Sequence, residues 1–265
     1  MNLFWREMKA SRKSLIIWIV GIIAMVAGGM GKYAGMAESG DSINELMADL
    51  PKTLQAVFGV GDLDIATPIG YYGVLFLYLL LMGTIHASML GANILSKEER
   101  DKTSEFLLVK PISRERMLAF KLLAALANVV VFNVVMSVSS LLVVDTYAAE
   151  GESVAGDIIT LMIGMLFVQL VFLSIGFAIA GAGKKPKRAV AISSAVMLLT
   201  FLLSIAIEVS GKIDFLRFLT PFQYVDASEV LGSGLGIGYM LLSLGIFAVC
   251  LAIMFVGYKR RDIQV

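Results

Sequence analysis

The chain contains 265 residues, of which 58% are hydrophobic and 16% charged, and its formal net charge is +1. This much apolar sequence excludes most classes of soluble enzyme, and a net charge near zero gives no argument for a nucleic-acid partner. The one cysteine, Cys250, cannot form an internal disulfide, so we interpret it as a small apolar residue of the core.

Six long apolar segments divide the sequence into spans and gaps. Each is close to or above the roughly 20 residues that a helix needs to cross a bilayer core of about 30 Å. The segments cover residues 15–31, 71–95, 118–144, 158–182, 189–209 and 235–258. They predict an all-α polytopic membrane protein in which residues 1–265 form a single transmembrane domain.

The basic residues fall in every second gap between the spans. Eighteen of the 22 lysines and arginines lie before the first span, between or beside the second and third, between the fourth and fifth, or after the sixth. Because cytoplasmic loops are enriched in Lys and Arg, both termini are expected in the cytoplasm. Basic residues beside spans also attract anionic headgroups, so membrane lipid is an expected partner.

Residues 1–14 precede the first span and mix apolar with charged side chains. Leu3, Phe4 and Met8 are apolar, and five charged residues surround them. This pattern suits a short helix that lies on the inner membrane surface before the chain enters the bilayer. A frayed cytoplasmic tail is the alternative interpretation.

The first outer gap contains a second amphipathic stretch, residues 41–58. Its apolar residues recur at helical spacing, and they are Ile43, Leu46, Met47, Leu50, Leu54, Val57 and Phe58. Pro51 breaks or kinks the middle of the stretch. One or two short amphipathic helices are therefore expected on the outer surface or over the end of the bundle. Packing is their favoured purpose, and substrate binding is the alternative.

The second inner gap, residues 96–117, is the longest on the cytoplasmic side. An apolar cluster at residues 106–108 is flanked by charges, Pro111 ends the local helix, and Ser113 can cap the next one. The gap therefore reads as a compact helix–turn–helix. An apolar knob facing the cytosol suits docking into a groove of another protein, and folding onto its own bundle fits equally well.

A few polar residues interrupt the spans. They are His86 and Asn93 in the second span, Asn128 and Asn133 in the third, and Gln169 in the fourth. Polar groups at membrane depth usually face the interior of the bundle or a wet cavity. They either line a translocation path or form hydrogen bonds between helices. The last outer gap, residues 214–226, is too apolar for a free loop and is expected to re-enter the membrane or lie in its outer interface.

Three stretches together resemble the permease subunit of bacterial type-2 ATP-binding-cassette (ABC) exporters with six spans. The inner gap resembles that family's conserved element through Glu98, Glu99, Thr103, Glu105, Phe106, Leu107, Leu108, Pro111, Ile112, Ser113 and Arg114. The first outer gap resembles its pattern through Leu50, Pro51, Leu54, Phe58, Gly59, Pro68, Gly70 and Tyr71. The last outer gap resembles its Thr-Pro-Phe-x-Tyr-x-Asp run through residues 220–222, Tyr224 and Asp226.

The resemblance implies that residues 98–108 form a coupling helix, which sits in a groove on a separate cytosolic ABC ATPase. The implied docking residues are Glu98, Glu99, Thr103, Glu105, Phe106, Leu107 and Leu108. The amino-terminal surface helix corresponds to the family's interfacial elbow helix. The resemblance further implies export across the cytoplasmic (inner) membrane, with a second copy or a related permease completing the pathway.

The sequence agrees with an ATPase on another chain. A phosphate-binding loop needs Ser or Thr after its Gly-Lys pair. The Gly-Lys pairs of this chain, which are Gly31-Lys32, Gly183-Lys184 and Gly211-Lys212, lack it. No cofactor and no catalytic residue are therefore expected here, with ATP and Mg on the partner. The scarcity of polar groups in the spans favours an amphipathic or hydrophobic compound or peptide as cargo.

Two other classes of protein compete with a permease. An intramembrane metalloprotease would need an arginine where the chain has Thr103 after Glu98 and Glu99, and it would need more metal ligands than the single histidine, His86. A membrane sensor or scaffold that transports nothing would share the six spans, but it would not need an apolar knob in the inner gap.

Overall fold

The computed structural model describes residues 3–37, 41–61, 63–101, 113–149, 153–183 and 185–260. Within these ranges every regular element is a helix, and six helices are long and apolar enough to cross a membrane. They are α1 (Leu3–Ala37), α4 (Pro68–Arg100), α6 (Arg114–Asp145), α7 (Ala155–Ala182), α8 (Pro186–Ser210) and α10 (Ile237–Arg260). The prediction of an all-α protein with six spans is confirmed.

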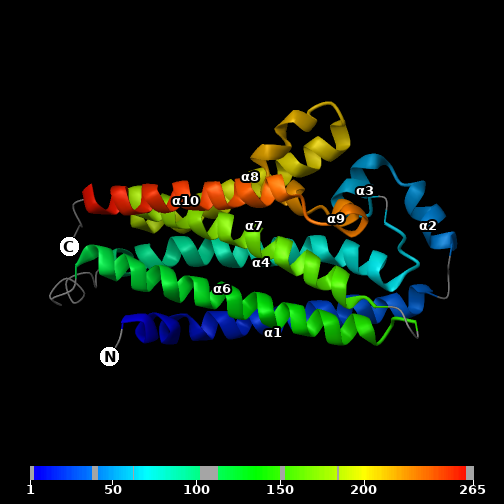
Figure 1. The fold of residues 1–265 in the computed structure, drawn as a ribbon, viewed down its shortest axis with the longest axis horizontal. Coiled ribbons are helices and arrows are strands. Elements are labelled where there is room, and N and C mark those ends of the chain that lie inside the picture. Colours follow the sequence, from blue (N-terminus) through cyan, green and yellow to red (C-terminus); the bar gives the residue numbers. More distant parts are fainter. Residues whose placement is uncertain are drawn as a thin grey trace.

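The long helices lie side by side in one elongated bundle (Figure 1). α4 and α7 form its centre, because 56% and 61% of their most apolar windows are buried, against 11% for α10 and 22% for both α1 and α8. α1 packs on α6 and α4, and α10 packs on α7. The apolar faces of α1, α8 and α10 are therefore left for lipid or for another membrane protein.

Glycines let the two central helices approach closely. A Cβ atom built on Gly176 of α7 would stand 2.6 Å from the backbone oxygen of Ser88 and 2.8 Å from the backbone nitrogen of Ala92, both in α4. Backbone atoms cannot move away as a flexible side chain can, so only glycine fits at this crossing. By contrast, a Cβ atom on Gly31 or Gly35 in α1 would meet nothing within 4 Å.

The start of α1 and the end of α10 lie at the same end of the bundle (Figure 1). α4 ends and α6 begins at this end as well, which we call the charged end because its helix termini carry most of the basic residues. Those in the described ranges are Arg6, Lys9, Arg12, Lys13, Lys97, Arg100, Arg114, Arg116, Lys121, Lys185, Lys187, Arg188, Lys259 and Arg260.

The amino terminus differs from the prediction. A separate surface helix over residues 1–14 was expected before a span over 15–31, whereas Leu3–Ala37 is one continuous helix of 35 residues. No glycine or proline occurs between residues 3 and 20, so nothing interrupts the helical hydrogen bonds. At about 1.5 Å per residue the helix is about 52 Å long. Its first turns therefore extend beyond a bilayer core of about 30 Å without a bend.

The opposite end of the bundle carries short helices. α2 (Asp41–Ala48) and α3 (Lys52–Phe58) are separated at Pro51, as predicted, and α3 ends at Gly59 with a left-handed φ of 70°. Asn44 fixes α2 to the following loop, donating to Asp64 Oδ1 at 2.6 Å and accepting from the Ile65 amide at 3.0 Å. These contacts support a packing role for the first outer gap.

The last outer gap folds back along α8. It forms two 3₁₀ helices, η1 (Asp214–Leu219) and η2 (Pro221–Val225), followed by α9 (Ala227–Ser233). Thr220 donates to the backbone oxygen of Thr200 at 2.9 Å, and Gln223 donates to that of Ser204 at 3.2 Å. All five residues of η2 are buried, which explains the apolar residues of that half of the gap, whereas Phe215, Phe218 and Leu219 of η1 are exposed.

Candidate functional site

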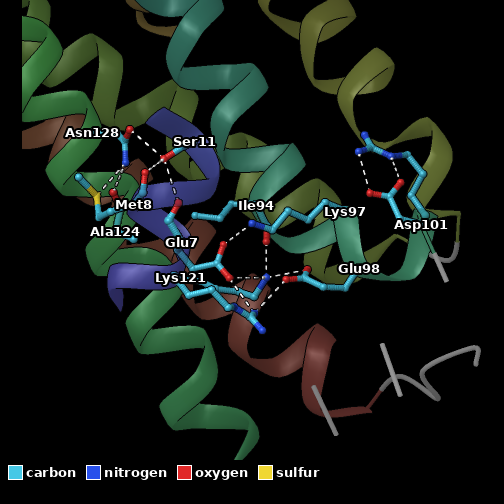
Figure 2. Close-up of polar contacts among 12 residues, drawn as sticks. Glu7, Met8, Ser11, Ile94, Lys97, Glu98, Asp101, Lys121, Ala124 and Asn128 are labelled. Atoms are coloured by element: carbon cyan, nitrogen blue, oxygen red, sulfur yellow. Dashed lines mark hydrogen bonds and ion pairs between the residues drawn. The ribbon is translucent and has the colours of Figure 1, made fainter. Parts of the chain in front are cut away.

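A buried cluster of charged side chains joins three helices at the charged end. Figure 2 shows Glu7 of α1, Lys97 and Glu98 of α4, and Lys121 of α6 pointing toward one another. Lys121 Nζ lies 2.7 Å from Glu98 Oε2 and 3.9 Å from Glu7 Oε1, and Lys97 forms an ion pair with Glu7. Arg6 completes the ion cluster, lying 3.0 Å from Glu7 and 3.4 Å from Glu98.

The centre of the ion cluster is shielded from solvent, whereas Arg6 and Lys97 at its edge are 32% and 21% exposed. The side chains of Glu7 and Lys121 are 0% and 1% exposed, and that of Glu98 is 12% exposed. Buried charges are costly unless each is paired and hydrogen-bonded. Lys121 meets this need by donating to the backbone oxygen of Ile94 as well as to Glu98. The cluster is therefore stable only when α1, α4 and α6 keep one particular register.

A neutral polar network continues from the ion cluster along α1. Ser11 lies one helical turn after Glu7 and donates to the Glu7 backbone oxygen at 3.0 Å. Its hydroxyl also lies 3.1 Å from Oδ1 of Asn128 in α6, and the Asn128 amide donates to the Ala124 backbone oxygen at 2.7 Å (Figure 2). Ser11 and Asn128 thus hold α1 against α6 one turn deeper than the charges do.

A cavity of about 360 Å³ opens beside this network. It lies between α1, α4, α6 and α8, and its lining comprises Ala10, Ser11, Ser14, Leu15, Trp18, His86, Met89, Leu90, Asn93, Arg100, Asn128 and Val190. Three of the five polar residues that the sequence singled out in the spans, His86, Asn93 and Asn128, therefore gather at one site. We refer to it below as the polar cavity.

His86 and Asn93 are held differently within the polar cavity. The His86 ring stacks on Phe132 of α6 with 4.5 Å between ring centroids, and its edge meets Trp18 of α1 at 5.8 Å. Asn93 accepts a hydrogen bond of 2.9 Å from Arg100, which also donates to Asp101 at 2.9 Å. That guanidinium lowers the pKa of Asp101 by hydrogen bonding.

The other two polar residues of the spans lie elsewhere. The amide of Asn133 in α6 donates to Gln169 Oε1 in α7 at 3.2 Å and to the backbone oxygen of Met162 at 3.2 Å. Both side chains are buried, and neither lines the polar cavity. This pair corresponds to the interhelical hydrogen bonds that were one of the two interpretations of the sequence.

The docking residues implied by the resemblance are described only in part. Glu98 and Glu99 lie in the last turn of α4, and Glu98 points into the ion cluster. Thr103, Glu105, Phe106, Leu107 and Leu108 lie outside the described residues. Ser113 caps α6 as predicted, accepting from the Arg116 amide at 3.3 Å. Among the residues that the structure describes, no group of three or more His, Cys, Asp or Glu could hold a metal ion.

The ion cluster itself was not predicted from the sequence. Lys97 and Lys121 were interpreted only as topology signals, Arg6 as a topology signal and part of an amphipathic surface helix, and Glu7 only as part of that helix. The available signal was that charges of both signs occur near the same ends of three spans. This signal identifies the pairs of the ion cluster only when the packing of α1 on both α4 and α6 is known.

Six long apolar helices with charges gathered at one end define a polytopic helical membrane protein. The model of the family described as ABC-2 family transporter protein matches residues 1–263, almost the whole chain. The chain therefore belongs to the ABC-2 transporter family, and the resemblance seen in the sequence is confirmed. No curated protein matches it.

Proposed function

We propose that this protein is the permease subunit of an ABC exporter, driven by a separate cytosolic ATPase that docks on the inner gap between α4 and α6. The observation that carries the proposal is the buried ion cluster. It links Glu98, at the base of the inner gap, directly to Lys121 of α6, and it links Glu98 to Glu7 of α1 through Arg6 and Lys121. Family membership supports an ABC ATPase as the partner.

The ion cluster gives the docking event a mechanical consequence. A force on the inner gap acts first on the end of α4 and the start of α6, which flank it. Because Lys121 binds Glu98 and approaches Glu7, moving one of these helix ends without the others would separate buried charges. The three helix ends therefore move together. Closure of the ATPase on binding ATP then displaces the spans and not only the loop between α4 and α6.

The distribution of charge supports a cytoplasmic position for the charged end. Lysines and arginines next to spans favour the cytoplasmic side, and most of those among the described residues gather at the end where α1 begins and α10 ends. Both termini would then face the cytoplasm of a bacterial inner membrane. ATP and Mg would be bound by the partner ATPase, in keeping with the absence of a Gly-Lys-Ser/Thr sequence from this chain.

The exposed apolar faces leave room for a second permease. Ile17 in α1, Leu199 in α8 and Leu241 in α10 are among the exposed large apolar side chains, and these helices lie at the periphery of the bundle. Lipid covers part of such a surface in any membrane protein. A second copy of this chain, or a related permease, would cover the rest and complete the translocation path.

The substitution Phe106→Asp tests the docking role. The ATPase that co-purifies with this chain from native membranes is assayed for ATP hydrolysis in the complex, with and without the substitution. A charge in the apolar knob should abolish both co-purification and stimulated hydrolysis while the permease stays in the membrane. Phe215→Asp is the matched control, because Phe215 is an exposed phenylalanine of η1 outside the charged end. Full stimulation in the Phe106→Asp complex would exclude the docking role.

A further inference from the structure

We propose that the polar cavity between α1, α4, α6 and α8 binds a single-tailed amphiphile whose head group forms hydrogen bonds and is not cationic. The inference deepens the proposed function, on which it rests for the idea that the ligand is cargo taken from the inner leaflet. The binding itself depends only on the residues that line the cavity.

The residues that line the polar cavity change in type in the same order along two helices. On α1 the lining changes from Ser11 and Ser14 to Leu15 and Trp18 as the helix leaves the charged end. α4 is antiparallel to α1. From the charged end toward the middle of the bundle, its lining residues change from Arg100 and Asn93 to Leu90, Met89 and His86. The two walls therefore agree: polar groups lie toward the charged end and mainly apolar groups lie deeper.

This gradient matches an amphiphile in a membrane. A head group near the charged end would meet hydroxyl, amide and guanidinium groups, and an apolar tail would extend along Leu15, Leu90 and Met89 toward the middle of the bilayer. The volume of about 360 Å³ lies at the lower end of the range of about 300–1,000 Å³ for small-molecule sites. A cavity of this size suits one tail better than the several chains of a bulky lipid.

An unsatisfied polar atom lies at the deep end of the polar cavity. His86 is 4% exposed, and its Nδ1 has no hydrogen-bond partner among the described residues. Its ring is held by Phe132 and Trp18, so it cannot easily turn away. Buried polar atoms in proteins are nearly always paired. A polar group on the ligand, or a water molecule that enters with it, would supply the missing partner.

The charge of the cavity lining also selects among head groups. Among the residues that the structure describes, Arg100 is the one charged residue in the lining, and no described aspartate or glutamate contributes to it. Asp101 pairs with Arg100 at 2.9 Å but does not line the cavity. A cationic head group would therefore find a cation and no anion facing it. An anionic or neutral head group meets Arg100, Asn93 and Ser14 without this penalty.

Trp18 provides a direct assay of binding, since it lines the cavity and the chain has only one other tryptophan, Trp5. The purified W5F variant is placed in phosphatidylcholine nanodiscs without any ATPase. A fatty acid brominated on its tail is then titrated while Trp18 fluorescence is followed. We expect saturable quenching at a low mole fraction of probe, and at least about tenfold weaker quenching by a brominated alkyl-trimethylammonium probe.

Two variants in the W5F background separate the cavity from general contact with lipid. Ser14→Phe fills the cavity from an exposed position of α1, and Ile17→Phe adds a ring to the same helix at a position outside the lining. The half-saturating concentration should rise about tenfold or more in Ser14→Phe and stay unchanged in Ile17→Phe.

Quenching that grows in proportion to the probe, and is equal in both variants, would mean ordinary contact between Trp18 and the bilayer and would overturn the proposal. Stronger binding of the cationic probe would overturn it as well. Because no ATPase takes part, a failure here would leave the docking role intact. Conversely, Phe106→Asp should leave the quenching unchanged even if it shows that the docking role is wrong.

Discussion

Neutralising Glu7 is the most informative perturbation of the ion cluster. Within the described part of the chain three cations face two carboxylates in this cluster, and Glu7→Gln leaves Glu98 as the one described carboxylate facing them. Lys121 is almost fully buried and lies 3.9 Å from the lost charge. Two unit charges about 4 Å apart attract by about 4 kcal/mol at an effective dielectric constant of about 20. Breaking a buried pair typically costs about 3–5 kcal/mol, which is the expected loss in the free energy of unfolding.

Lys121→Met is the contrasting variant. It removes a buried cation, fills most of the same volume, and leaves two cations facing two carboxylates. Because the remaining charges are then equal in number, the substitution leaves no buried charge unpaired, so the loss should be below about 2 kcal/mol. Glu115→Gln is the control, since its ion pair with Lys259 is exposed and should contribute nothing measurable.

The assay is reversible unfolding in mixed micelles, titrated with sodium dodecyl sulfate and followed by tryptophan fluorescence. The reasoning predicts that Glu7→Gln is destabilised more than Lys121→Met and that Glu115→Gln unfolds as the native protein does. Two results would refute the view that charge balance stabilises the cluster. One is a free energy of unfolding for Glu7→Gln within about 1 kcal/mol of the native value, and the other is a loss in Lys121→Met as large as that in Glu7→Gln.

Three further predictions concern the helices and their ends. Gly176→Ala should lower the free energy of unfolding by about 1–3 kcal/mol, because its Cβ atom would meet the backbone of Ser88, whereas Gly28→Ala should change it by less than about 1 kcal/mol. Ser113→Ala should cost about 1 kcal/mol by removing the cap of α6, measured in the same titration. Burial raises the pKa of Tyr224 to about 12, so the absorbance change at alkaline pH should include a late-titrating phenol that Tyr224→Phe removes. Its contribution to stability should be complete below about pH 10, fade as pH rises through about 12, and be absent from Tyr224→Phe.

Hydropathy and charge were sufficient to predict the six spans and the gathering of basic residues at one end. These features depend on segment length and composition, which are properties of the sequence itself. Local rules also held at two breakpoints, because Pro51 separates α2 from α3 and Ser113 caps α6. The helix break that was predicted near residue 14 is absent. The charge pattern was the only basis for that prediction. Without a proline or glycine, the helix simply continues.

Contacts between helices could not be predicted in the same way. His86, Asn93 and Asn128 share a cavity, whereas Asn133 pairs with Gln169, yet in the sequence all five are isolated polar residues in apolar segments. Which of them meet depends on the rotation and pairing of the helices. Those are set by packing, including the close approach at Gly176, and not by any single segment.

Central to the proposed function is that a separate cytosolic ATPase docks on the inner gap between α4 and α6. The most direct test of this docking is a photo-reactive phenylalanine analogue at the position of Phe106, activated in membranes that contain the native partners. The account predicts a cross-linked product that joins this chain to an ATP-binding protein. Cross-links formed only within the chain would show that the gap folds onto its own bundle, and would contradict the account.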